Sequence, residues 1–242
     1  MMAPVTALPR RFRAELIARS DLSPRVQAFR FRAHGEFAWA AGQYVDLLLP
    51  GDGNGQTKAP YSIASVVDAR FPSEFELAVA RGGSNPGLDE IATGTEFEAE
   101  GPLGALTWHA ADSPSAAVLV GVGTGVAPLR ALIHEQLERG GSSKLLLLAG
   151  NRSETDLLWG SELSALAKKH PRFRFEPTLS SPTSSWHGRR GRVQAHMSEL
   201  IEPLGTDVFV YVCGQSAMVS DVVGSLRTRH GLQPARIKGE GH

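Results

Sequence analysis

Cysteine is almost absent from this sequence: Cys213 is the single cysteine among 242 residues. One cysteine cannot form a disulfide within the chain. It also cannot supply the several thiolates that hold an iron–sulfur cluster or a cysteine-ligated zinc ion. Any such cluster would therefore have to be carried by another polypeptide.

Net charge and long apolar segments are absent too. Lys plus Arg and Asp plus Glu both number 25, so the formal charge is zero, which argues against the electrostatic attraction that nucleic-acid and membrane-surface binders use. No segment approaches the roughly 20 apolar residues that cross a bilayer, and the N-terminus lacks the apolar core of a signal peptide. We therefore expect a cytoplasmic protein that neither binds nucleic acid nor inserts into a membrane.

The eight histidines lack the spacing of a metal site. The segment "HEQLE" begins at His134 and has Glu138 where a zinc protease would carry its second histidine. We therefore expect no metal ion.

Short β-rich segments dominate the first part of the chain. Each is bounded by Gly, Pro, Ser or Asp residues, and they lie at residues 12–17, 26–32, 44–49, 61–64, 75–80 and 96–100. Six short strands with few helical patterns predict a small antiparallel β-barrel, closed or nearly closed.

The pattern changes after residues 111–115. The apolar segments "AAVLVGV", "KLLLLAG", "FRFEPTL" and "VFVYVCG" alternate with helical patterns. This alternation is typical of βαβ units around a parallel sheet that is buried on both faces. We predict two domains: a β-barrel over residues 1–112 and an α/β domain with a doubly wound parallel sheet over residues 113–242.

Two helices are predicted in the α/β domain. The first places Leu129, Leu132 and Leu137 on one face, and Gly140 follows as its end. The second begins at "SETD", where Ser153 can cap the free amide groups of the first turn.

The segment "GVGTGVAPLRALI" lies between the first predicted parallel strand and its helix. Glycines allow a tight turn and the close approach of a diphosphate, while the helix N-terminus offers unpaired amides and a partial positive charge. Pro128 suits the first turn because its missing N–H costs nothing there. Val126 occupies the third glycine position of the G-x-G-x-x-G pattern of dehydrogenases, so turn chemistry alone leaves an ordinary β–α connection equally open.

Cys213 and Gly214 end the last apolar segment, and a helical pattern starts near Ser216. Ligands of open α/β sheets gather beyond the carboxyl ends of the strands, which places Cys213 beside the glycine-rich turn. An isolated buried cysteine more commonly serves as a small hydrophobic residue, and no neighbouring histidine in the sequence identifies Cys213 as a nucleophile.

Three segments of the barrel half are further candidate motifs: "KAPYSIAS" (58–65), "ARGGSNPGL" (80–88) and "GPLG" (101–104). Each alone is compatible with a simple turn or strand end. Their order, followed by "GTGVAP" and a late "CG…M", resembles that of the ferredoxin–NADP reductase superfamily of flavin-dependent oxidoreductases. The resemblance extends over about residues 12–218, and its barrel-then-α/β order agrees with the domains predicted above.

The resemblance implies a flavin, FAD rather than FMN, on the barrel. Tyr61 would pack its ring on the isoalloxazine, and Ser62 would hydrogen-bond near the ring nitrogen that accepts hydride, with Ala59 and Pro60 beside them on the same strand. Backbone amides of a loop would bind the flavin phosphates. That loop comprises Gly82, Gly83, Ser84 and Asn85, and "GPLG" would close the domain junction.

The resemblance also implies a pyridine-nucleotide site in the α/β domain. Its loop would comprise Gly123, Thr124, Gly125 and Pro128. Cys213 and Gly214 would flank the nicotinamide, so that Cys213 shapes the hydride-transfer pocket, together with Tyr61 and Ser62, and attacks nothing.

Relatives that prefer NADPH often carry an arginine after the third strand, where this chain has "TLSSP" (178–182). We therefore predict NADH over NADPH. Arg189, Arg190 and Arg192 follow closely and leave the alternative open.

Two departures from the family concern the flavin. Ala59 stands where an arginine usually pairs with flavin phosphate, and Lys58 and Arg81 are the nearest substitutes in sequence. Since adjacent strand residues point to opposite faces, we predict the larger contribution from Arg81. The chain also ends in "IKGEGH", so that Glu240 or His242 occupies the place of the usual terminal aromatic residue, or the flavin face is open.

These features predict an NADH-dependent flavoprotein reductase that passes electrons to a separate redox protein, such as a ferredoxin or an oxygenase component. Two alternatives remain at this point. One is a flavin reductase that uses loosely held flavin as its substrate. The other is a non-catalytic electron-transfer or regulatory subunit.

Overall fold

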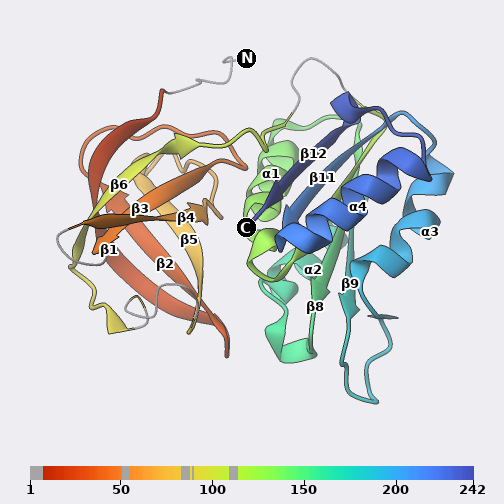
Figure 1. Ribbon diagram of the computed structural model, residues 1–242, viewed down its shortest axis with the longest axis horizontal. Helices are drawn as coiled ribbons and strands as arrows, with labels where there is room; N and C mark the ends of the chain where they lie inside the picture. Colours follow the sequence, from red (N-terminus) through yellow and green to blue (C-terminus); the bar gives the residue numbers. More distant parts are fainter. Residues whose placement is uncertain (1–7, 51–54, 83–87, 89, 109–113) are drawn as a thin grey trace.

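The first part of the chain forms a six-stranded antiparallel barrel (Figure 1). The computed structural model describes residues 8–50, 55–82, 88, 90–108 and 114–242. The barrel strands are β1 (Arg10–Ser23), β2 (Val26–Ala33), β3 (Tyr44–Pro50), β4 (Gln56–Ser62), β5 (Glu74–Ala80) and β6 (Glu96–Leu103). They pair in the order β4-β3-β6-β1-β2-β5, and a bridge between Ile63 and Leu77 brings the two outer strands together. The predicted barrel is confirmed.

Aromatic side chains fill the barrel. Phe29, Phe31 and Phe75 are almost completely buried there, and the rings of Phe31 and Phe75 stack with centroids 5.5 Å apart. Such rings bury large apolar areas, which explains how a small barrel obtains a core.

The predicted start of β4 was wrong. We expected a strand over residues 61–64, but β4 begins at Gln56 because the segment before Tyr61 pairs with β3, for instance Lys58 with Leu48. Pro60 is tolerated because β4 lies at the edge of the sheet, where a missing N–H breaks no ladder.

The second part of the chain builds a parallel sheet between helices, as predicted. Its strands are β7 (Ala116–Val122), β8 (Lys144–Asn151), β9 (Phe173–Leu179), β10 (Arg189–Arg190), β11 (Val208–Gly214) and β12 (Ile237–Gly241). Its α-helices are α1 (Val126–Arg139), α2 (Gly160–Lys169), α3 (Met197–Ile201) and α4 (Ser216–Thr228). The 3-10 turns are η2 (Gly123–Gly125), η3 (Glu154–Asp156), η4 (Val193–His196), η5 (Glu202–Leu204) and η6 (Pro234–Arg236).

Alternating side chains of the central strands separate the two helical layers. Leu119 of β7 and Tyr211 of β11 face α1 and α2, whereas Val118 and Val210 face α3 and α4. The strand order β10-β9-β8-β7-β11-β12 reverses direction between β7 and β11. Ligands of such sheets bind at this reversal, beyond the carboxyl ends of the strands.

The second predicted helix begins later than expected. Ser153 and Asp156 do form a reciprocal cap, but the turn they close is η3, and α2 starts only at Gly160. The first helix buries Leu129, Leu132 and Leu137 and ends before Gly140 as predicted.

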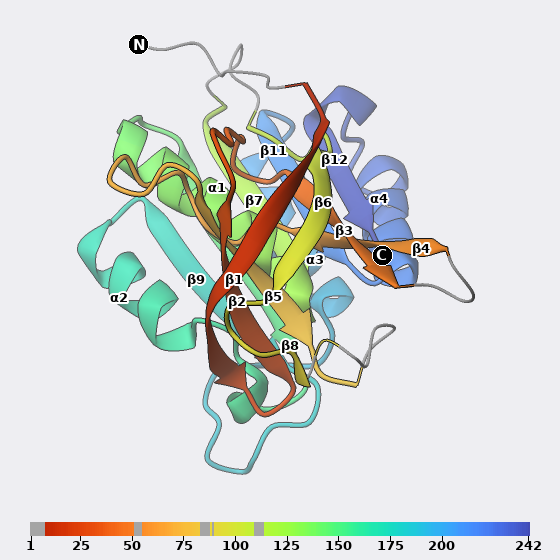
Figure 2. The ribbon, with the colours of Figure 1, turned by 90° about the vertical axis from the view of Figure 1, so that its left-hand side faces the viewer.

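The C-terminal strand β12 adds a parallel partner to β11 that the sequence did not predict. Figures 1 and 2 both place the C-terminus beside β4 of the barrel. The predicted boundary between residues 112 and 113 lies outside the described residues, so it stays a prediction.

Candidate functional site

A cleft of about 530 Å³ lies between the barrel and the α/β domain. This volume is within the range of cofactor sites. Five of the predicted site residues line it: Ala59, Pro60, Tyr61 and Ser62 from β4, and Thr124 from η2. Segments more than 60 residues apart in the sequence therefore meet in one wall.

The floor of the cleft is built from small side chains. Ala59 is 3% exposed, and Ala78 of β5 and Ala127 of α1 are also buried. Tyr61 is half-buried and packs against the barrel core. A wall of small side chains with two tyrosines, Tyr44 and Tyr61, fits a planar ring that stacks.

The loop from β7 to α1 brings the nucleotide domain to the cleft. Gly123 adopts φ +57°, a left-handed conformation that favours glycine, and Gly125 precedes α1. Among the described residues, no side chain caps the N-terminus of α1, and Pro128 is buried in its first turn. The N–H of Val126 already donates to the carbonyl oxygens of Gly123 and Thr124, so a phosphate group would be held by the amides at the start of η2 and by the helix dipole.

Gly125 lies directly against the end of β11. A Cβ atom at this position would be 2.3 Å from the carbonyl oxygen of Cys213 and 2.7 Å from Cα of Gly214. The predicted residues of the loop and of the "CG" pair are therefore neighbours, and only glycine allows this separation.

Cys213 lies behind the cleft rather than in its wall. Its side chain is completely buried, and burial, followed by the nearby charge of Glu240, raises the thiol pKa to about 12. The sulfur is therefore a protonated thiol at neutral pH, which agrees with a shaping role and not with a nucleophile.

Nine of the described lining residues were missing from the predicted site: Tyr44, Thr57, Lys58, Ala78, Ala80, Ala127, Glu240, Gly241 and His242. The sequence had indicated Lys58, Glu240 and His242 as candidates near the flavin without assigning them to the site, whereas Tyr44 gave no signal. The parallel pairing of β12 with β11 places Glu240 opposite Cys213, and His242 exchanges backbone hydrogen bonds with Gly214 and Ser216.

Burial disfavours charged side chains at this end of the cleft. It raises the pKa of Glu240 and lowers the pKa of His242. Both shifts favour the neutral side chain.

Comparison with known proteins agrees with this arrangement. Residues 119–224 match the family described as the oxidoreductase NAD-binding domain. Ferredoxin–NADP reductase B of Sorangium cellulosum is 41% identical over 219 residues, which cover 86% of this chain and 88% of that protein.

The chain belongs to the ferredoxin–NADP reductase superfamily.

Two other relatives of the reductase are longer proteins. The reductase subunit of an Amycolatopsis aromatic O-demethylase is 33% identical over 208 residues, which cover 84% of this chain and 60% of that protein. The crystal structure of an Amycolatopsis cytochrome P450 reductase superimposes with a TM-score of 0.87 at 32% identity, over 98% of this chain and 71% of that one. The chain therefore spans about 60–70% of these two relatives.

These findings confirm the predicted superfamily, fold class and oxidoreductase class. They also confirm a flavin and a pyridine nucleotide as the cofactors of the family, without distinguishing NADH from NADPH.

The reductase contains a buried donor at the place expected for the nucleotide. Asn151 ends β8, and its side-chain nitrogen Nδ2 is buried without a hydrogen-bond partner among the described residues. A buried unpaired donor is costly, and an oxygen-rich ligand beyond the carboxyl ends of β7 and β8 would satisfy it. The donor set therefore fits a pyridine nucleotide.

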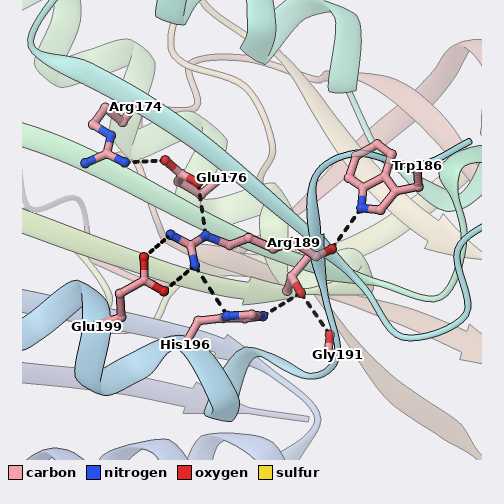
Figure 3. A network of polar contacts seen from close by, with 8 residues as sticks. Arg174, Glu176, Trp186, Arg189, Gly191, His196 and Glu199 are labelled. Atoms are coloured by element: carbon pink, nitrogen blue, oxygen red, sulfur yellow. Dashed lines mark hydrogen bonds and ion pairs between the residues drawn. The ribbon is translucent and has the colours of Figure 1, made fainter.

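The loop after β9 is held by a polar network (Figure 3). Arg189 makes a two-pronged ion pair with Glu199 at 2.7 and 2.8 Å, and its Nε donates to Glu176 at 3.0 Å. The hydroxyl of Thr178 contacts His196 and donates to the carbonyl oxygen of Gly191. Because its guanidinium is already occupied, Arg189 is not available to a phosphate.

The two following arginines differ from each other. Arg190 donates to the carbonyl oxygens of Thr183 and Trp186, within its own loop. The exposed Arg192 makes no side-chain hydrogen bond or ion pair in the described part of the chain. Arg192 is therefore the one cation of the three that a nucleotide phosphate could engage.

Lys58 and Arg81, the two possible substitutes for the missing arginine, differ in their position relative to the cleft. Lys58 lines the cleft, and its amine binds Glu100 at 2.8 Å and lies 3.8 Å from Asp46. Arg81 is not part of the described cleft wall and is paired with Asp21. The geometry favours Lys58, the reverse of the order predicted from the sequence. Gly82 follows β5 with φ +61°, whereas Gly83, Ser84 and Asn85 lie outside the described residues.

The described residues contain no group of three or more His, Cys, Asp or Glu side chains arranged to hold a metal ion. Their helices include none with the length and apolar character needed to cross a membrane.

Proposed function

We propose that the reductase takes a hydride from NADH at the cleft between its domains, holds FAD there, and passes electrons to a separate redox protein. The observation that carries this proposal is the shared wall formed by Tyr61 and Ser62 of the barrel and Thr124 of the nucleotide loop. When bound, the flavin accepts the hydride from the reduced nicotinamide and can release electrons singly.

The side chains of the reductase position and shield the reacting rings. Tyr61 provides a stacking surface, and the hydroxyl of Ser62 orients a ring nitrogen. Glu240 and His242 close the other side of the cleft, where burial disfavours their charged forms. Most of the rate enhancement then comes from alignment and from the exclusion of water.

The phosphate groups of the two cofactors would be held separately. The amides at the start of η2, the dipole of α1 and the side-chain amide of Asn151 suit the nucleotide diphosphate. On the barrel side, β4 is the proposed flavin strand, and its Lys58 supplies a cation to the described cleft wall.

The preference for NADH is supported by the loop after β9. "TLSSP" carries no arginine, and Arg189 and Arg190 are both engaged within the protein. A relative named for NADP supports the opposite preference, which would have to depend on Arg192. Comparison of kcat/KM for NADH and NADPH in the wild type and in Arg192→Gln distinguishes the two preferences. The proposal expects both proteins to prefer NADH. A wild type that prefers NADPH, with that preference lost in the variant, contradicts it.

The electron acceptor is proposed to be a separate protein, in the cytoplasm. The single cysteine cannot hold an iron–sulfur cluster within this chain. The Amycolatopsis relative is named as the reductase subunit of a larger system, which supports the same division of labour.

A second function, reduction of loosely held flavin as a substrate, is favoured by one observation. Ala59 provides no cation for flavin phosphate, and the amine of Lys58 is partly neutralised by Glu100 and Asp46. A charged hydrogen bond contributes about 1.5–3 kcal/mol, so its loss would weaken flavin binding substantially.

An anaerobic titration of the purified protein tests these proposals. Bound yellow flavin that is bleached by NADH supports the first function. Colourless protein that oxidises NADH only with added flavin supports the second. Protein that binds a nucleotide but shows neither reaction would contradict both and leave the non-catalytic subunit.

A further inference from the structure

Arg130 joins the two domains at a point next to the cleft. It lies on α1 and is only 16% exposed. Its Nη1 donates to the carbonyl oxygen of Ala64 in the barrel at 2.7 Å. Its Nε and Nη2 form a two-pronged pair with Glu162 of α2 at 2.8 and 2.9 Å, and the guanidinium lies 4.9 Å from the ring centre of Trp159.

The partners of Arg130 are themselves held in place. His134, one turn further along α1, contacts Glu162 at 2.6 Å, and Glu76 of β5 lies 3.6 Å from the guanidinium. Burial acts to raise the pKa of Glu162, but hydrogen bonds from His134 and Arg130 outweigh it and hold the pKa at about 2. Glu162 is therefore a permanent carboxylate at neutral pH.

The barrel end of this contact lies just beyond β4, the proposed flavin strand. Ala64 follows Ser62 by two residues, and its own N–H donates to the backbone carbonyl oxygen of Glu76 in β5. Arg130 follows Thr124 by six residues on the segment that begins with the nucleotide loop. The guanidinium of Arg130 therefore connects two segments that are close in sequence to the cleft. One carries Ser62 and the other carries Thr124.

An apolar cluster lies beside this contact. Val26, Ala64 and Ala78 of the barrel pack with Ala127 and Leu158 of the α/β domain. Apolar burial is non-directional, so this cluster holds the domains together without fixing their orientation. A second ion pair between the domains, Arg25 with Asp156, is long at 3.8 Å and its arginine is exposed, so it contributes little. A planar guanidinium with several simultaneous partners does fix orientation.

We propose that Arg130 is a positioning residue that sets the separation and angle between the flavin strand and the nucleotide loop. This inference rests on the proposed hydride transfer for its kinetic consequence, and on the contacts above for its structural consequence. Misplacement of reacting groups by about 1 Å can lower a rate about 100-fold. Loss of the guanidinium is therefore expected to slow hydride transfer while each domain keeps its own ligand.

The kinetic test compares Arg130→Gln, Arg130→Lys and a control, Arg139→Gln, on the same helix. Arg139 forms an exposed pair with Glu135 and contacts no barrel residue in the described structure. Anaerobic stopped-flow bleaching at saturating NADH should slow by up to about 100-fold in Arg130→Gln, with flavin and nucleotide affinities unchanged. Lysine keeps the charge without the planar fork, so partial recovery is expected, and the control should match the wild type.

A distance measurement tests the same inference without any activity. Spin labels on Ser20→Cys in the barrel and Ser220→Cys on α4 report the separation of the domains by pulsed electron double resonance, since both positions are exposed. Cys213 stays unlabelled because it is buried and its thiol pKa is about 12. The wild type and Arg139→Gln should show a narrow distribution of distances, and Arg130→Gln a broader or shifted one.

The outcomes separate the two proposals. If neither nucleotide bleaches the wild type, the proposed function fails, but the distance distributions still decide the role of Arg130. A wild-type distance distribution in Arg130→Gln overturns the positioning role, whatever the rate. If Arg130→Gln does not fold, Arg130→Lys carries both measurements, and wild-type behaviour in that variant overturns the inference.

Discussion

Gly125→Ala is the substitution with the sharpest expected effect. The new Cβ would lie 2.3 Å from the carbonyl oxygen of Cys213, roughly 1 Å closer than the ~3.3 Å of an unstrained carbon–oxygen contact. The obstacle is backbone of the central strand β11, which cannot rotate away as a side chain could. The loop that carries Thr124 must therefore move by about 1 Å, a displacement that can cost about 100-fold in rate, and overpacking should cost about 1–3 kcal/mol of stability.

The assay is anaerobic bleaching of bound flavin by NADH, measured together with thermal unfolding. Gly140→Ala at the other end of α1 is the matched control: a Cβ there meets no atom within 4 Å, but φ is +72°. Strain at that position should cost about 1–3 kcal/mol, a similar loss of stability with no loss of rate. If Gly125→Ala reduces flavin as fast as the control does, the argument from close approach is refuted.

Three further predictions concern the cleft. Lys58→Ala should lower flavin affinity more than Arg81→Ala, because only Lys58 lines the described cleft; fluorescence titration with FAD measures both, and the opposite order would restore the expectation from sequence. The thiol of Cys213, with its pKa raised to about 12, should resist iodoacetamide in the folded protein and react on unfolding, and rapid labelling of native protein would contradict its burial. Burial raises the pKa of Glu240, so the carboxyl stabilises the fold below its unfolded pKa and this contribution is lost as the pH rises through the folded pKa. Glu240→Gln should accordingly unfold at a higher temperature than the wild type at pH 7, and the gain should vanish at about pH 3, below the ordinary glutamate pKa of about 4.3.

Local sequence patterns predicted most elements correctly where one physical signal dominated. The apolar runs of β7, β8, β9 and β11 and the leucine face of α1 depend on periodicity alone. Prediction was weaker where two signals competed. At "SETD" the capping signal was correct but closed only a 3-10 turn, since a cap specifies where a turn begins and not how far it continues. At β4 the predicted strand began only at Tyr61, after Pro60, and pairing with β3 extends it back to Gln56.

Site residues, too, were predicted where a local motif identified them and missed where none did. Tyr61, Ser62 and Thr124 were identified from motifs that are short and contiguous, and the structure brings all three into one cleft. Tyr44 was missed because nothing in its own neighbourhood distinguishes it from an ordinary strand residue. The roles assigned to the site residues remain proposals, and the experiments above address them.

The sequence by itself determined the order of a barrel and an α/β domain, the glycine-rich turn before α1, and the absence of a cluster of thiolates in the chain, because each depends on composition or on neighbours along the chain. Only the tertiary structure decided that Lys58 and not Arg81 faces the cleft, that β12 returns Glu240 and His242 to it, and that Arg130 reaches Ala64 across 66 positions of sequence. Such contacts depend on how the two domains pack, and a guanidinium looks the same in the sequence whether it lies in solvent or joins two domains.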